Sequence, residues 1–108
     1  GTAIILGDIG DNFGAGMTGG VAFVYDKNKN LKKNLNNSSV ERIELLKSNK
    51  VTIDYFKKVI KDYYRETGSI KAQEIIKNLP LELKNFKLVK PLNSSMEDII
   101  KNTINKVA

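Results

Sequence analysis

The first 26 residues, GTAIILGDIGDNFGAGMTGGVAFVYD (Gly1–Asp26), decide the fold. Two short apolar and β-branched runs, Thr2–Leu6 and Val21–Tyr25, flank a glycine-rich stretch. Each run has the length and composition of a buried strand. At an offset of nineteen residues the runs and their preceding glycines align, with glycine and alanine identical and apolar or β-branched residues elsewhere. One strand and one glycine-rich turn per repeat indicate a solenoid, whose successive coils stack their apolar sides.

Six glycines in this stretch have two competing interpretations: Gly7, Gly10, Gly14, Gly16, Gly19 and Gly20. Residues 14–19 match the G-x-G-x-x-G pattern of dinucleotide-binding folds, which must join a strand tightly to a helix. Here a strand-like run follows the glycines, so the helix that would face a pyrophosphate is missing. We interpret the six as structural glycines at the corners of a coil, with Phe13 and Met17 as core side chains.

The absence of two residue types limits the chemistry of the chain. It contains no cysteine and no histidine. Disulfides, thiol catalysis, most nucleophile–base pairs and most zinc sites therefore cannot be built from these residues. We predict no catalytic, cofactor-binding or metal-binding residue in the chain. No apolar run approaches the roughly 20 residues that cross a bilayer, so we also expect no membrane partner and a cytoplasmic location.

The basic charge is unevenly distributed. The net charge is +6, yet residues 1–26 carry three aspartates and no lysine or arginine. The basic residues are mostly lysines interleaved with asparagine and glutamate, as in residues 27–34. Such runs are typical of a solvated loop or helix face. We therefore predict no nucleic-acid partner, although clustered positive charge is what such binding would need.

The rest of the chain mixes one short strand with helices. We predict a strand at Ile43–Leu46 and a helix that Thr52 caps, that runs to residue 66 and that ends at Gly68. Ser69 then caps a second helix. Two helices joined by so tight a corner should form an αα-hairpin.

Three further features complete the predicted order. Pro80 should end the second helix at Leu79. Phe86–Val89 is extended, and a last helix begins at Ser94 or Ser95 and runs to about Lys106. We predict a single domain, with β-helix coils and a short strand in residues 1–46 and a helical cap in residues 52–108.

The glycine-rich run and three later segments carry a family resemblance. The run from Leu6 to Asp26 resembles the GXGXG domain at the C-terminus of the glutamate synthase large (alpha) subunit. Similar elements of that domain match Glu41–Leu45, Thr67–Ala72 and Phe86–Pro91, in the same order and over essentially the whole chain.

This resemblance implies a fold and a role. It implies the terminal coils of a single-stranded right-handed β-helix, mainly β with α, followed by the αα-hairpin and a C-terminal helix. The parent enzyme makes two glutamates from glutamine, 2-oxoglutarate and two electrons. Its amidotransferase domain releases ammonia, and a central domain with FMN and an iron–sulfur cluster consumes it. The β-helix domain holds these domains together and binds none of these cofactors, so this chain is expected to be non-catalytic.

The resemblance leaves more than one possible parent protein and set of partners. The implied partners are the other domains of the synthase and its small subunit. A related β-helix also occurs as a separate subunit of redox complexes such as formylmethanofuran dehydrogenase. Because one coil cannot bury its own core, the chain looks cut from something longer, and the strand at Thr2–Leu6 should pair with another strand, in a second copy if necessary.

Overall fold

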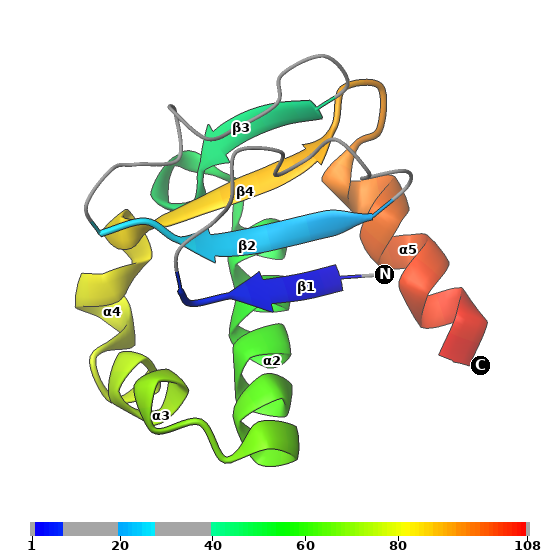
Figure 1. Ribbon diagram of the computed structural model, residues 1–108. Helices are drawn as coiled ribbons and strands as arrows, with labels where there is room; N and C mark the ends of the chain where they lie inside the picture. The colour runs from blue at the N-terminus through cyan, green and yellow to red at the C-terminus, as the bar shows by residue number, and fades with distance from the viewer. Residues whose placement is uncertain (1, 8–19, 28–39, 108) are drawn as a thin grey trace.

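The computed structural model describes residues 2–7, 20–27 and 40–107, with side chains as far as Lys101. These residues form one four-stranded sheet, with α2, α3 and α5 packed against the same core (Figure 1). The strands are β1 (Thr2–Ile5), β2 (Val21–Tyr25), β3 (Val40–Glu44) and β4 (Phe86–Pro91). The helices are α2 (Lys50–Thr67), α3 (Ile70–Lys77), α4 (Leu79–Glu82) and α5 (Met96–Val107), with 3₁₀ turns at Leu45–Lys47 and Leu83–Asn85.

The sheet has the strand order β1-β2-β4-β3. β1 and β2 are parallel, and Thr2 pairs with Val21 and Ile5 with Val24. This register is the nineteen-residue offset of the sequence repeat, so both the two strands and their alignment are confirmed. β4 runs antiparallel to β2 and to β3 and lies between them. The second edge of β2 is therefore occupied by an antiparallel strand from far along the chain.

α2 begins three residues earlier than predicted. Its N-cap is Asn49, whose side-chain oxygen accepts a hydrogen bond from the Thr52 backbone N–H at 2.9 Å. Thr52 lies inside the helix and is buried, so the prediction that it caps the helix was wrong. The helix ends as predicted at Gly68, in the left-handed region with φ 66°, where its N–H donates to the Tyr64 carbonyl oxygen at 2.8 Å. A side chain is disfavoured in that conformation, which explains the glycine.

The start of the second predicted helix is confirmed and its end is not. The Ser69 hydroxyl accepts from the Ala72 N–H at 3.1 Å at the start of α3, which contacts α2. α3 ends at Lys77, and Pro80 lies in the first turn of α4 instead of terminating a helix. Proline is tolerated there because the first N–H groups of a helix need no intrahelical partner.

The other boundaries follow from long-range pairing. β3 spans Val40–Glu44 and not the predicted Ile43–Leu46, because it pairs with β4 from Val40–Pro91 to Glu44–Lys87. Leu45 is fully buried from the 3₁₀ turn that follows. β4 extends two residues beyond the predicted Phe86–Val89. α5 begins after Ser95, whose hydroxyl accepts from the Asp98 N–H at 3.2 Å, as predicted.

Two apolar clusters lie on the two faces of the sheet. The larger joins alternate residues of β2 and β4, among them Phe23 and Phe86, to the helices. Phe56 of α2 sits between these two rings, with ring centroids 5.1 Å from Phe23 and 4.6 Å from Phe86. The smaller cluster contains Ala22, Val24, Val40 and Val89, with Ile5 packed against it. Alternation along a strand places these two sets on opposite faces.

The fold class is therefore mixed α/β with an open four-stranded sheet. Residues 8–19, which connect β1 to β2, lie outside the described residues, so a complete coil is not traced and the right-handed β-helix stays a prediction. The division at residues 46 and 52 also stays a prediction. In the part of the chain that the structure describes, no helix has the length and apolar character to cross a membrane.

Candidate functional site

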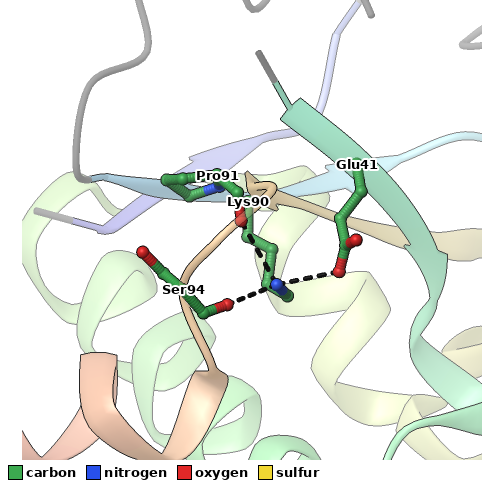
Figure 2. Close-up of polar contacts among 4 residues, drawn as sticks. All are labelled: Glu41, Lys90, Pro91 and Ser94. Atoms are coloured by element: carbon green, nitrogen blue, oxygen red, sulfur yellow. Dashed lines mark hydrogen bonds and ion pairs between the residues drawn. The ribbon is translucent and has the colours of Figure 1, made fainter.

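Of the charged side chains that the structure describes, the most buried is a lysine on β4. Lys90 is 7% exposed, and its Nζ lies 2.8 Å from the Glu41 carboxylate on β3 (Figure 2). The ammonium also donates to the backbone oxygens of Pro91 and Ser94. Glu41 and Lys90 are direct cross-strand partners, so the sheet register brings the two charges together. This junction joins β3, β4 and the turn into α5 (Figure 2).

A second lysine of β4 lies farther from its carboxylate partner. Lys87 is 9% exposed and lies 3.8 Å from Glu44, its cross-strand neighbour. Glu44 also pairs with the exposed Lys47 at 2.9 Å, in the 3₁₀ turn that follows β3. The hydrogen bond to Glu44, and then the negative charge of Glu44, raise the pKa of Lys47 by stabilising its ammonium form.

A third junction lies where β2 ends. The Tyr25 hydroxyl donates to Glu82 of α4 at 2.8 Å, and the Asn85 side-chain amide donates to the same carboxylate at 2.8 Å. The Asp26 backbone N–H donates to the Asn85 carbonyl oxygen at 2.7 Å, and Lys71 Nζ of α3 lies 5.2 Å from the centre of the Tyr25 ring. Burial, then the hydrogen bond and the negative charge of Glu82, raise the pKa of Tyr25 to about 12. The phenol therefore stays protonated and joins the sheet to the helices.

The polar groups at these junctions connect parts of the chain to one another. Each charge or hydroxyl in them contacts another group of the same chain. Within residues 2–7, 20–27 and 40–101, no buried side-chain nitrogen or oxygen lacks a hydrogen-bond partner. Among the same residues, no group of three or more acidic, histidine or cysteine side chains could hold a metal ion. The arrangement that the structure describes is suited to holding elements together.

The predicted structural glycines are only partly described. Gly10, Gly14, Gly16 and Gly19 lie outside the described residues. Gly20 directly precedes β2, and a Cβ placed on Gly7 would meet no heavy atom within 4 Å. The coil-corner role of the six glycines therefore stays a prediction.

Comparison with known proteins identifies the family of this chain. The family model described as "GXGXG motif" matches residues 1–92. The chain belongs to the GXGXG family. The match includes the four strands that the structure describes and the helices between β3 and β4, and it stops before α5. The resemblance found in the glycine-rich run and in the three later segments is confirmed.

Relatives of this GXGXG chain share one activity in their names. It is 34% identical over 91 residues to "Glutamate synthase [NADH]" of Schizosaccharomyces pombe, covering 84% of this chain and 4% of that protein. It is 33% identical over 100 residues to the "Ferredoxin-dependent glutamate synthase" of Antithamnion sp., covering 93% and 6%. It is 32% identical over 93 residues to "Glutamate synthase [NADPH] large chain" of Bacillus subtilis, covering 86% and 6%. The chain thus spans about one twentieth of the length of these curated relatives.

Sequence reasoning missed the polar junctions of the GXGXG chain. Lys87 and Lys90 sit in a lysine-rich region, where a lysine is normally solvated. The sequence of β4 did carry a signal, because charged residues interrupt an otherwise apolar strand. Glu41 and Glu44, in another short strand, could supply the opposite charges. That signal gains meaning only once β3 and β4 are known to pair.

The Lys90 junction should contribute measurable stability. We expect Glu41→Thr to lower the free energy of unfolding by about 1–3 kcal/mol, because it leaves a buried ammonium with fewer charged contacts. Urea unfolding followed by circular dichroism measures the change. Replacing both partners, Glu41→Thr with Lys90→Met, should recover part of the loss. Glu74→Ala on the exposed face of α3 is the control, with an expected change within about 0.5 kcal/mol. A Glu41 loss no larger than the control would contradict the role of this junction.

Proposed function

We propose that this chain is a structural domain of a glutamate synthase. The parent would convert glutamine and 2-oxoglutarate, with two electrons, into two glutamates. The observation that carries the proposal is the similarity over most of the chain to proteins that are all named glutamate synthases. Their names differ in the electron donor, which is NADH, ferredoxin or NADPH. An assay of the parent must therefore offer each of these three donors.

The proposed role is a scaffold. In this proposal an amidotransferase domain releases ammonia, and a domain with FMN and an iron–sulfur cluster consumes it. The GXGXG chain keeps these domains in position and contributes no reacting group. The junctions centred on Lys90 and Tyr25 support this role, because both join secondary-structure elements within the chain. Function belongs to sites and not to folds, so this role needs its own test.

The proposed fold of this scaffold is the end of a right-handed β-helix. Its support is the parallel pairing of β1 with β2 in the register of the sequence repeat. Within the described sheet, β2 has β4 on its other side, so further coils would add at β1. The uncharged sequence of β1, Thr2–Ile5, suits pairing with such a strand. The other domains of the synthase, and its small subunit where one exists, are the proposed partners.

The activity of the complete polypeptide tests the proposal first. Incubated with glutamine, 2-oxoglutarate and NADH, NADPH or reduced ferredoxin, it should form glutamate with one of these donors. Failure with all three, in a folded and flavin-loaded protein, would contradict the proposed parent activity. If the gene instead encodes a short, separate polypeptide, the redox-complex subunit becomes the better assignment.

The isolated chain should bind none of the redox cofactors. We expect calorimetric titration of residues 1–108 with FMN and with NADPH to show no saturable heat in the micromolar range. The physical reason is that the element after the glycines is the strand β2, whereas a pyrophosphate site of this pattern needs a helix there. Micromolar binding that Gly16→Val abolishes would overturn the scaffold assignment, and Ile70→Ala on the exposed surface serves as the control.

A further inference from the structure

The two edge strands of the sheet have opposite chemical character. Among the described strands, β1 and β3 each have a neighbour on one side only. β1 reads TAII and contains no charge. β3 reads VERIE, and three of its five side chains are charged: Glu41, Arg42 and Glu44. Exposed edges template pairing with another strand unless charges or other features block it.

The charges of β3 are held in place by β4. Lys90 and Lys87, whose side chains are 9% and 11% exposed, pair with Glu41 and Glu44 across the strands. The two glutamates remain 36% and 47% exposed, and Arg42 is also at the surface. Glu41 is therefore fixed on one enclosed ammonium and partly exposed to water. Glu44 lies between the enclosed Lys87 and the exposed Lys47 and is also partly exposed.

A strand added beside β3 would disturb this arrangement. Its side chains would lie about 5 Å from those of β3 and would displace the water around both glutamates and Arg42. Removing water from charged groups is unfavourable unless new partners replace it. The glutamates cannot turn away, because each would leave an enclosed lysine without its carboxylate.

We propose that β3 is a closed edge, at which Glu41, Arg42 and Glu44, anchored by the lysines of β4, prevent a further strand from pairing. The partner it excludes is a second copy of the same protein, which could otherwise add antiparallel across a two-fold axis. The sheet consequently extends in one direction only, from β1. The edge at β3 lies opposite the one used in the proposed function, and its closure does not depend on the enzymatic activity.

The test opens the edge without leaving a buried charge unpaired. In the complete polypeptide, Arg42→Val, Glu44→Thr and Lys87→Met are combined, so that both members of one ion pair are removed. A triple variant on the exposed surface of α2, Lys58→Val, Asp54→Thr and Lys61→Met, removes the same kinds of charge from a helix. Sedimentation velocity over a concentration series measures the weight-average mass of each protein.

The β3 variant should associate and the α2 variant should not. We expect the mass of the β3 variant to rise with concentration toward roughly twice that of the unmodified protein. A β3 variant that retains its circular dichroism spectrum and sediments like the unmodified protein would overturn the proposal, as would equal association of both variants. If the triple variant does not fold, Arg42→Val combined with Glu41→Thr and Lys90→Met decides by the same criterion, because it removes both members of the other ion pair.

Discussion

Replacing Phe56 with alanine is expected to lower the free energy of unfolding by about 3–5 kcal/mol. Phe56 is fully buried, and its ring lies between those of Phe23 on β2 and Phe86 on β4. Through this ring α2 contacts both central strands. Removing the ring leaves a cavity that these neighbours can fill only in part. Folded domains of this size are stable by only about 5–15 kcal/mol, so much of the stability would be lost.

Urea unfolding of the 108-residue chain measures this loss, and the melting temperature should fall by roughly 15 °C or more. Ile70→Ala is the matched control, because Ile70 is 72% exposed at the start of α3. Its expected change is within about 0.5 kcal/mol. A Phe56 loss below about 1 kcal/mol would mean that α2 does not pack on the sheet as described.

Adding a charge to β1 is expected to have the largest effect on the proposed function. Ala3 is exposed on an edge strand with no charged residue, and Ala3→Lys introduces the residue that natural edges use to block pairing. If β1 joins this chain to the rest of the synthase, the domains would lose their relative positions. We expect glutamine-dependent glutamate formation by the complete polypeptide to fall by about tenfold or more, since small misplacements of reacting groups are this costly.

A matched variant separates the effect of the added charge from the effect of replacing the alanine. Ala3→Thr places a β-branched, uncharged residue at the same edge and should retain the activity within about twofold, because such residues suit strands. In the isolated chain, the unmodified β1 should also support self-association that Ala3→Lys abolishes. Sedimentation measures this association. Loss of activity in both variants would point to a steric effect at Ala3 and not to a blocked edge.

The sequence predicted the local features well. β1 and β2, and their parallel register, followed from a repeat in which glycine and alanine coincide at the same offset. Gly68 and Ser69 marked the corner between two helices because their backbone preferences are local. The family resemblance rested on the same glycine-rich run.

Features that depend on distant pairing were not predictable in this way. The position of β4 between β2 and β3 joins segments more than forty residues apart, and no local pattern specifies it. Asn49 and Thr52 both suit an N-cap, and the choice depended on where the buried face of α2 begins. The burial of Lys90 was hidden for the same reason, because its partner Glu41 lies on another strand.

Two rates measured in the complete polypeptide carrying Ala3→Lys test the scaffold role. One is glutamate formation from glutamine, and the other is glutamate formation from added ammonia. A scaffold role predicts that the glutamine-dependent rate falls while the ammonia-dependent rate and the bound flavin are retained, because no residue of this chain reacts. Loss of both rates together with the flavin would contradict the scaffold role and would place part of a reactive site in this chain.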